Sequence, residues 1–514
     1  MKKTLVCLLF LFSGLLCGCE KTPEKEVVLS KVDGLPEGTA VEKSKEVKEI
    51  SVPENWEETI SKNDGAVTVE AKGISIFVPE IKNTPITEVK RTAFGEEQLK
   101  KLTDYFRGNN PLQEPSLLTK DEGSAYMEKI KNKEGAYGNP SLEEGMNTTD
   151  RLSNLKKIME ALPGEDIQTA EIKEPAFGSY KEDTYEAMLS GGNEEYMQET
   201  FGDCFFSAEI PGKDDKKARI SAVKYDAEKG LNGGFFYIEG GVVTESQIQK
   251  AEDMQEEASE KWKSEFADFS AKFEEETEEL SLTEEQAEEE ARKVLEDLEI
   301  QNMQVRTIEK VFWSPTDTRW DFMDPDWEKG QAGYKFYMGM DNEGLVSYSQ
   351  SGGTFYQDLS EAVYKPSFAP EEIQVVVTED GMKSFLWKNM SEKGKVIAEN
   401  TNLLPFEEIT EKLGSHMLAV KVAVDSINGF DGKETSNEWA VKSVQLQSSY
   451  VPAYEAPQNS WLVPVWVFEL EGCTINHLDG DRKGRPKKET VVLSAVDGGY
   501  VSPVQEMDFL TDFQ

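Results

Sequence analysis

The chain of 514 residues carries 56 basic and 98 acidic residues, which gives a formal charge of −42 at pH 7. Such an acidic surface repels phosphate backbones and anionic lipid headgroups, so nucleic acid is excluded as an expected partner. Cations, basic peptides and cationic wall components suit this surface, although solubility alone also explains it. With 38% hydrophobic residues, the chain can form several cores of ordinary size.

The first 18 residues have the composition of a secretory signal peptide. Lys2 and Lys3 precede an apolar run from Leu5 to Leu16, and Gly18 supplies the small residue that a signal peptidase needs at its cleavage site. The apolar run is about a dozen residues long, shorter than the roughly 20 that a helix needs to cross the hydrocarbon. We therefore expect this segment to be a cleaved signal rather than a permanent membrane span.

Cys19 directly follows Gly18, and Leu16 stands three positions before it. These residues resemble a bacterial lipobox. The resemblance implies that the sulfur of Cys19 receives a diacylglyceryl group and that cleavage after Gly18 leaves Cys19 as the N-terminus. Two acyl chains give stable anchoring, since each buried methylene contributes about 0.8 kcal/mol. The expected location is the extracytoplasmic face of the cell membrane; an ordinary secretory signal with an incidental cysteine is the alternative.

Residues 20–55 are rich in Lys, Glu and Val and contain three prolines, which is typical of a flexible tether. An ordered first strand over residues 46–52 is the alternative. The domain organisation expected from these patterns is a signal peptide (1–18), a lipidated N-terminus with tether (19–55), an N-terminal α+β domain (56–243), acidic helices with a first α+β unit (244–360), and a C-terminal α+β domain (361–514).

The N-terminal domain is expected to alternate between strands and helices. After the turn signal Asp64-Gly65, two alternating runs at 67–71 and 74–78 predict paired strands. Apolar residues at helical spacing predict a helix over 96–106, ended by Gly108, and another over 150–162. Three further runs, at 204–210, 218–225 and 234–238, are separated by glycine-containing turns and predict an antiparallel meander.

Residues 244–299 have the strongest helical pattern. Trp262, Phe266, Phe269 and Phe273 are spaced by four, three and four residues, so their rings lie on one side of a helix. This aromatic stripe is expected to pack on the chain's own sheet, with a partner-binding face as the alternative. A second helix begins at Thr283, where Gln286 completes a capping box.

A pattern of one helix followed by three strands occurs twice in the C-terminal half. The first copy comprises a helix from residue 283 and strands at 305–313, 333–340 and 345–349. The second comprises a helix at 405–417 and strands at 439–449, 461–470 and 490–495. We interpret the two as a tandem repeat, while two unrelated α+β segments remain the alternative. The overall prediction is a multidomain α+β protein with antiparallel sheets and packed helices.

The last strands contain Pro464-Val-Trp466-Val-Phe468 and, further on, Val491-Val-Leu-Ser-Ala-Val-Asp497-Gly-Gly-Tyr500-Val. They resemble the closing strands of PepSY-like domains, which occur in extracytoplasmic regulators of Gram-positive cell-wall kinases and in peptidase propeptides. Together with the lipobox, the chain resembles large surface lipoproteins of Gram-positive (Firmicutes-type) anaerobes. This resemblance implies a binding or regulatory role and transfers no functional residue beyond Cys19. Those kinase regulators are tethered by a membrane helix, so the lipid anchor departs from their pattern.

The five cysteines do not form a disulfide framework. Cys7 and Cys17 leave with the signal peptide and Cys19 is the expected lipidation site, which leaves Cys204 and Cys473 in the folded body. Two cysteines so far apart in sequence are interpreted as buried apolar residues, with a disulfide between them as the alternative.

The sequence contains no recognisable catalytic, metal or cofactor motif. The two histidines, His416 and His477, are too few for a histidine-based zinc site, and metal or triad hydrolysis is disfavoured. The loop Asp479–Gly484 resembles part of a calcium loop, but Lys483 occupies a ligand position and Thr490 stands where a bidentate Glu belongs. We interpret this loop as a hairpin turn and His477 as a turn residue.

Three functions remain after these exclusions. The first is a non-catalytic surface lipoprotein that binds a peptide, a wall fragment or an envelope partner, with a possible regulatory role, and requires no cofactor. The second is the solute-binding lipoprotein of a transporter, which should have two α/β lobes around a cleft. The third is an envelope glycan hydrolase that uses two carboxylates, which a chain with 98 acidic residues does not exclude.

Overall fold

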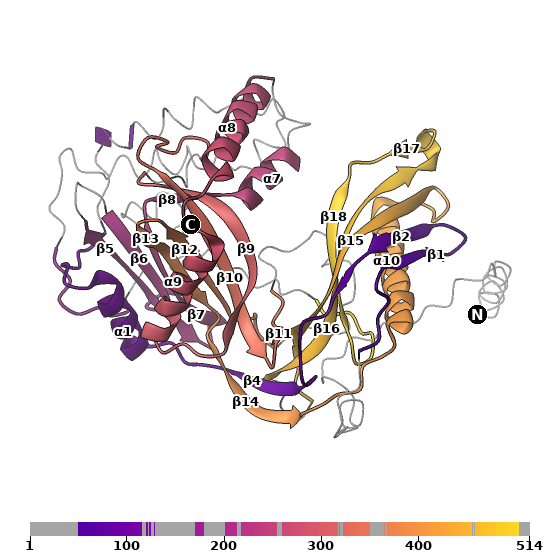
Figure 1. The fold of residues 1–514 in the computed structure, drawn as a ribbon, viewed down its shortest axis with the longest axis horizontal. Coiled ribbons are helices and arrows are strands. Elements are labelled where there is room, and N and C mark those ends of the chain that lie inside the picture. The colour runs from indigo at the N-terminus through magenta and orange to yellow at the C-terminus, as the bar shows by residue number, and fades with distance from the viewer. Residues whose placement is uncertain are drawn as a thin grey trace, which may run out of the picture.

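The protein has two lobes, each built on a large β-sheet, that stand apart at one end and meet at the other (Figure 1). The computed structural model describes residues 50–115, 120–121, 123–124, 128, 170–178, 201–212, 217–253, 260–316, 318, 322–349, 364, 367–454, 456 and 458–502. Both sheets are antiparallel, apart from the parallel pairing of β15 with β2 and β3. The expected α+β class with antiparallel sheets and packed helices is confirmed.

The inserted lobe comprises strands β5 to β13 with helices α1 and α7 to α9. Its sheet has the order β5-β6-β7-β13-β12-β10-β9-β8, with β11 paired to β10. The strands are β5 (Phe205–Pro211), β6 (Lys217–Asp226), β7 (Leu231–Glu239), β8 (Gly241–Thr244), β9 (Met303–Ser314), β10 (Gln331–Asn342), β11 (Leu345–Val346), β12 (Glu372–Thr378) and β13 (Gly381–Lys388). The predicted meander corresponds to β5, β6 and β7 and is confirmed.

The terminal lobe comprises strands β1 to β4 and β14 to β18 with helix α10. Its sheet has the order β1-β2-β15-β16-β4-β14, with β17 and β18 paired to β16 and β3 paired to β15. The strands are β1 (Trp56–Lys62), β2 (Val67–Ile74), β3 (Ile76–Phe77), β4 (Ile86–Arg91), β14 (Ser391–Ala398), β15 (Thr435–Pro452), β16 (Ser460–Asn476), β17 (Arg482–Lys483) and β18 (Lys487–Ser494).

The chain order makes one lobe an insertion in the other. The strands before α1 and those after β13 belong to the terminal lobe, and all strands between them belong to the inserted lobe. The expected domain boundary at 243/244 falls within β8, inside the inserted lobe. The boundary at 360/361 also falls inside it, because β13 pairs with both β12 and β7. Strand pairing therefore crosses both boundaries.

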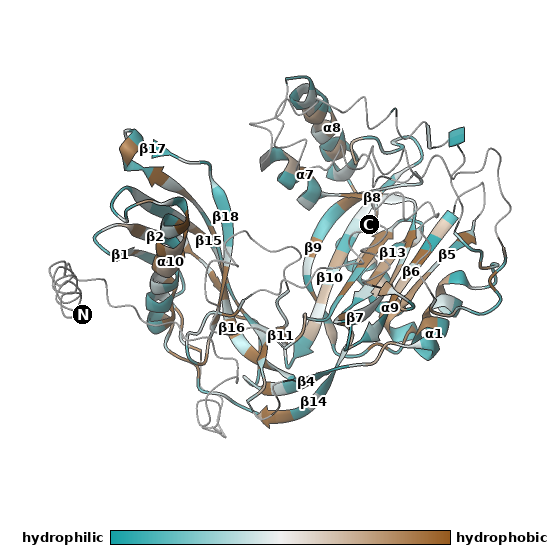
Figure 2. Ribbon diagram, turned by 180° about the vertical axis from the view of Figure 1, so that it is seen from behind, coloured by the Kyte–Doolittle hydropathy of each residue, from teal (hydrophilic) through white to brown (hydrophobic). Residues whose placement is uncertain are grey.

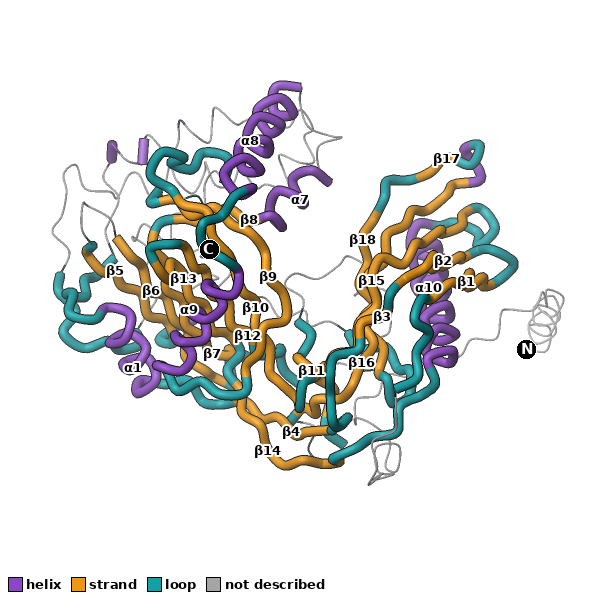
Figure 3. The backbone as a smooth tube through the Cα atoms, in the orientation of Figure 1, coloured by secondary structure: helices purple, strands orange, loops and turns teal. Residues whose placement is uncertain are grey.

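Helices cover the sheet of the inserted lobe in two places. Helices α1 (Glu96–Arg107) and α9 (Glu284–Asp297) pack on one face and close the largest core. The predicted capping box is present, since the Thr283 hydroxyl accepts from the Gln286 amide. Helices α7 (Glu245–Asp253) and α8 (Glu260–Glu278) lie near β8 and β9 (Figure 3).

The aromatic stripe of α8 packs within the chain, as expected. Its four rings are buried in a cluster with Val243, Ile248 and Phe312 of the same lobe. In Figure 2, α8 shows both hydrophilic and hydrophobic residues, as an amphipathic helix does. The expected packing of the stripe within the chain is therefore confirmed.

Helix α10 (Phe406–Asn428) packs on the sheet of the terminal lobe with Phe406, Ile409, Leu413 and Met417 buried. It runs eleven residues beyond the predicted end at Met417, and Gly429 ends it in the left-handed conformation, at φ 73°. No helix among the described residues is long and apolar enough to span a membrane.

The strand pairing expected after Asp64-Gly65 is wrong in one respect. The turn joins β1 to β2, so residues 67–74 pair with the preceding strand rather than with residues 74–78. Residues 76–77 form β3, which pairs in parallel with β15. The turn at Asp64-Gly65 is present, but the hairpin that it closes consists of β1 and β2. Residues 56–62 form the first strand of this hairpin because they also have the alternation typical of a strand. The helix predicted at 150–162 lies outside the described residues.

The two lobes share a continuous core where they meet. Val89, Tyr450 and Leu462 of the terminal lobe belong to the apolar cluster of the inserted lobe, and Leu345 of the inserted lobe belongs to that of the terminal lobe. The Ser448 hydroxyl also donates to the Leu345 carbonyl at 2.9 Å. The base of the molecule is therefore packed and hydrogen-bonded rather than joined only by a linker.

Candidate functional site

The middle of the inserted lobe's sheet has one apolar and one polar face. On β10, Phe336 and Met338 enter the core covered by α9, while Lys335 and Tyr337 alternate with them and lie on the opposite face. We call that opposite side the polar face. Its members are Arg306, Glu309, Lys335, Tyr337, Glu372, Gln374 and Lys388.

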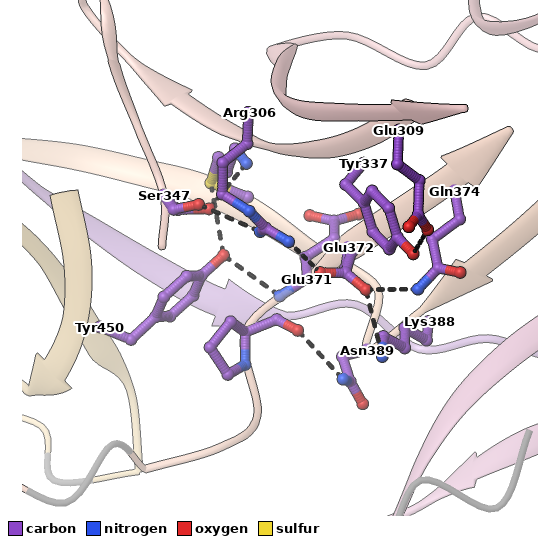
Figure 4. Close-up of polar contacts among 12 residues, drawn as sticks. Arg306, Glu309, Tyr337, Ser347, Glu371, Glu372, Gln374, Lys388, Asn389 and Tyr450 are labelled. Atoms are coloured by element: carbon purple, nitrogen blue, oxygen red, sulfur yellow. Dashed lines mark hydrogen bonds and ion pairs between the residues drawn. The ribbon is translucent and has the colours of Figure 1, made fainter. Parts of the chain in front are cut away.

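Glu372 is the centre of the polar face, with a side chain only 1% exposed. Its carboxylate accepts from Arg306 Nη2 at 2.5 Å and from Gln374 Nε2 at 2.7 Å, and pairs with Lys388 Nζ at 3.2 Å (Figure 4). Burial alone would raise the pKa of Glu372, but Lys388 and Arg306 outweigh it and hold that pKa well below its usual range. Glu372 is therefore ionised at neutral pH and fixes the Arg306 guanidinium.

A second hydrogen-bonded group continues toward α7. The Tyr337 hydroxyl donates to Glu309 Oε1, and Glu309 Oε2 accepts from the Ser246 amide at 3.0 Å. Burial and the neighbouring Glu309 raise the pKa of Tyr337, so its hydroxyl stays protonated. The Lys335 ammonium lies 4.9 Å from the centre of the Tyr337 ring, within cation–π range. Burial lowers the pKa of Lys335, and the Glu309 and Glu372 carboxylates oppose that effect.

A cavity of about 300 Å³ lies beside the polar face, between the two lobes. Its volume is at the lower end of the roughly 300–1,000 Å³ typical of small-molecule sites. The inserted lobe contributes Ser246, Lys250, Arg306, Thr307, Glu309 and Tyr337; the terminal lobe contributes Ser443, Gln445, Gln447, Val467 and Glu469; and Tyr348 and Ser349 follow β11. We call it the interlobe cavity.

The terminal lobe's wall of the cavity contains a buried acceptor without a donor. Gln447 Nε2 donates to Gln445 Oε1 at 3.2 Å, whereas Gln447 Oε1 is buried and has no hydrogen-bond partner among the described residues. Leaving such an atom unsatisfied costs about 1–3 kcal/mol. Nearby, the exposed Glu469 accepts from the Ser443 hydroxyl at 2.6 Å. A ligand with a hydrogen-bond donor would satisfy Gln447 Oε1.

Tyr348 lies where the two walls meet. Gly339 permits this, because a Cβ there would come within 2.5 Å of the Ser347 carbonyl oxygen. Ser347 accepts from the Met340 amide through its hydroxyl at 2.9 Å, and the Tyr348 amide donates to the Ser448 carbonyl at 2.7 Å. Burial raises the pKa of Tyr348 to about 12, with Arg306 lowering it and Glu469 raising it. Charges from both lobes therefore act on this hydroxyl.

Below the cavity, Glu371 is buried at the base of the molecule. Its carboxyl group accepts from Trp387 Nε1 at 2.7 Å and from the Ser391 hydroxyl at 3.0 Å. Its amide donates to the Tyr450 hydroxyl at 3.4 Å (Figure 4). Burial raises the pKa of Glu371 to about 7, against the opposing effect of the Trp387 and Ser391 hydrogen bonds. A carboxyl group that titrates near neutral pH therefore lies between the lobes.

The loop expected to be a hairpin turn joins β16 to β17 and β18. His477 in this loop bonds through Nδ1 to Asp481 Oδ1 at 2.6 Å and through Nε2 to the Ser436 hydroxyl at 3.1 Å. Along these hydrogen bonds, Asp481, His477 and Ser436 follow one another in the order of an Asp-His-Ser catalytic triad. However, Asp481 is 76% exposed, whereas the acid of such a triad is buried. We interpret the three residues as a clasp that holds the turn against β15.

The remaining residues singled out in the sequence lie apart from the cavity. Gly18 and Cys19 are outside the described residues. Cys204 and Cys473 are both free, Cys204 directly before β5 and Cys473 on β16, so the disulfide alternative is not formed. His416 on α10 stacks on Tyr500 with ring centres 4.0 Å apart, and burial lowers its pKa to about 4.

Sequence reasoning did not identify the residues of the polar face or the cavity. The available signal was the placement of charged residues inside strands that become central in a sheet, such as Lys335 in β10 and Glu372 at the start of β12. Charges at central positions are rarely buried unless they are paired, so they indicate a polar network. No sequence signal indicated that Arg306 and Gln447 line the same cavity, because the two residues belong to different lobes.

Comparison with known proteins gives little information on function. No protein-family model matches the chain, and no curated protein matches it. Among solved structures, an uncharacterized protein from Eubacterium rectale ATCC 33656 is similar with a TM-score of 0.39 and 12% identity. The match covers 88% of this chain and 94% of that protein.

Proposed function

We propose that this protein is a non-catalytic surface lipoprotein, anchored through Cys19, that binds a peptide or wall fragment in the interlobe cavity. The observation that carries the proposal is the unsatisfied Gln447 Oε1 in a cavity lined by both lobes. A buried acceptor without a donor is a cost to folding that a ligand would remove.

The charged groups around the cavity support binding more than chemistry. The Glu309 carboxylate is already engaged by the Tyr337 hydroxyl and the Ser246 amide, and Glu372 by two cations. Groups fixed in this way position a ligand but are not poised to exchange protons with it. The shared core at the base also keeps both walls in place before the ligand arrives, which reduces the entropic cost of binding.

The same geometry gives some support to a second candidate, the solute-binding lipoprotein of a transporter. Two lobes around a cavity are the arrangement expected for that function. The sheets, however, are mainly antiparallel, unlike the parallel sheets of α/β lobes, and the lobes share a core. We therefore favour the non-catalytic surface lipoprotein over the solute-binding lipoprotein of a transporter.

Calorimetric titration of the detergent-solubilised full-length protein with purified peptide and glycan fragments of the cell wall tests the proposal. We expect at least one fragment to bind, and Gln447→Leu to weaken its affinity tenfold or more. Gln301→Leu is the matched control, because Gln301 is exposed in the loop before β9 and outside the cavity. Turnover of a fragment, or equal affinity in the Gln447→Leu variant, would contradict the proposal.

A further inference from the structure

The two walls of the interlobe cavity differ in charge. The wall of the inserted lobe has four cations in and behind it, Lys250, Arg306, Lys335 and Lys388, against the carboxylates of Glu309 and Glu372. This local excess of cations stands out in a chain whose formal charge is −42. The inserted lobe's wall therefore favours an anionic group.

Two of these cations have no carboxylate of their own. Lys388 and Arg306 share Glu372, whereas neither Lys250 nor Lys335 forms an ion pair with a described residue. Lys335 is only partly exposed, and its ammonium lies over the ring of Tyr337. Lys250 is exposed on α7 and lines the cavity. A carboxylate in the cavity would compensate this charge and accept charge-assisted hydrogen bonds.

The wall of the terminal lobe has the opposite character. Glu469 lines it, and Glu489 is close enough to raise the pKa of the Tyr348 hydroxyl together with Glu469. Gln447 Oε1 adds an uncharged acceptor that lacks a donor. No cation from the described part of this lobe lines the cavity. This wall therefore favours a group that donates hydrogen bonds and carries positive charge.

We propose, building on the function proposed above, that the interlobe cavity binds a small zwitterionic peptide. Its carboxylate faces Lys250 and Arg306, and its ammonium group faces Glu469. A backbone N–H donates to Gln447 Oε1. The cavity volume of about 300 Å³ equals the liquid volume of about ten water molecules, which suits a ligand of dipeptide size. An ion of one sign would compensate only one of the two walls.

The ligand class is tested by titrating the detergent-solubilised full-length protein with alanyl dipeptides whose second residue is Ala, Gln, Glu or Lys. The same dipeptides are tested with the N-terminus acetylated and, separately, with the C-terminus amidated. We expect at least one uncapped dipeptide to bind and each cap to weaken it tenfold or more, because each removes one charge.

Variants assign the two charges to the two walls. Lys250→Gln should weaken the uncapped dipeptide tenfold or more while leaving the affinity of its amidated form unchanged. Glu469→Gln should also weaken the binding of the uncapped dipeptide tenfold or more. It should leave the affinity of the acetylated form unchanged. Lys293→Gln on α9 and Glu438→Gln on β15 are the controls, since both residues are exposed and lie outside the cavity.

The outcomes separate this inference from the proposed function. One outcome is that capped peptides or neutral glycan fragments bind as tightly as the uncapped dipeptides and lose affinity in the Gln447→Leu variant. This outcome would overturn the zwitterionic class of ligand and leave the binding function standing. Failure of every dipeptide and every wall fragment to bind would overturn both.

Discussion

Glu371 and His416 should give the stability of the folded protein two opposed pH dependences. Glu371 is buried between the lobes with its pKa raised to about 7, and His416 is packed against Tyr500 with its pKa lowered to about 4. Both shifts arise mainly from burial, which disfavours the charged form of either group. The perturbations are Glu371→Gln and His416→Gln, which remove one titration each.

For Glu371, the folded protein holds a proton that the unfolded chain releases at lower pH. The pKa rises from 4.5 in the unfolded reference to about 7 in the fold, so the stabilising contribution is complete below pH 4.5 and is lost as pH rises to 7. At about 1.36 kcal/mol per pKa unit, the loss is roughly 3 kcal/mol. Relative to wild type, Glu371→Gln should gain this amount between pH 4.5 and 7.5.

For His416 the sign is reversed. Its pKa falls from 6.5 in the unfolded reference to about 4 in the fold, so the contribution is complete above pH 6.5 and is lost as pH falls toward 4. The magnitude is again roughly 3 kcal/mol. The two effects oppose each other over the same pH range, so each is visible only when the other is removed or when a variant is compared with wild type.

Urea unfolding followed by tryptophan fluorescence, at half-unit steps from pH 4 to 7.5, measures these differences. The expected result is a difference between Glu371→Gln and wild type that grows with pH, and a difference for His416→Gln that grows as pH falls. Differences that stay constant within about 1 kcal/mol over the whole range would show that the groups titrate normally in the fold, and the burial argument would be refuted.

Two further predictions concern the buried charges and the loop clasp. Glu372→Gln should cost about 3–5 kcal/mol in the free energy of unfolding, because it leaves Arg306 and Lys388 buried without a carboxylate; the control Glu438→Gln removes an exposed pair and should cost at most about 1 kcal/mol. Similar costs in the two variants, measured by urea unfolding, would count against a buried network. A fluorophosphonate probe should leave Ser436 unlabelled in mass spectra, since the acid of the clasp is solvent-exposed; labelling that is lost in His477→Gln would disprove the non-catalytic function.

Local features of the fold were predictable from the sequence. The capping box at Thr283, the α8 stripe and the turn at Asp64-Gly65 depend on residues a few positions apart, and each appears in the structure. The length of α10 was underestimated because its second half contains several valines, which favour strands, and two charged residues, Lys421 and Asp425, that lie buried. Such boundaries depend on packing against β1 and β2, which a local pattern does not contain.

The lobe organisation could not be predicted in the same way. One lobe is inserted in the other, so the terminal sheet pairs β2 with β15 across more than three hundred residues. Periodicity identifies each strand and its buried face, but it carries no information on which distant strand is the neighbour. The cavity depends on that pairing, since Arg306 and Gln447 share it only after both sheets have formed.

The polar face is difficult to explain by stability alone. Taking the charges of Arg306, Glu372 and Lys388 out of water costs several kcal/mol each, and apolar side chains of similar volume often stabilise a fold better than a buried ion pair. The binding function proposed above would give this network a use. Glu372 holds the guanidinium of Arg306 at the cavity wall in a fixed position, so a ligand's anionic group would meet a donor that no longer has conformational freedom to lose. The cost in folding is thus understandable as preorganisation of a binding site, which the titration and unfolding experiments measure separately.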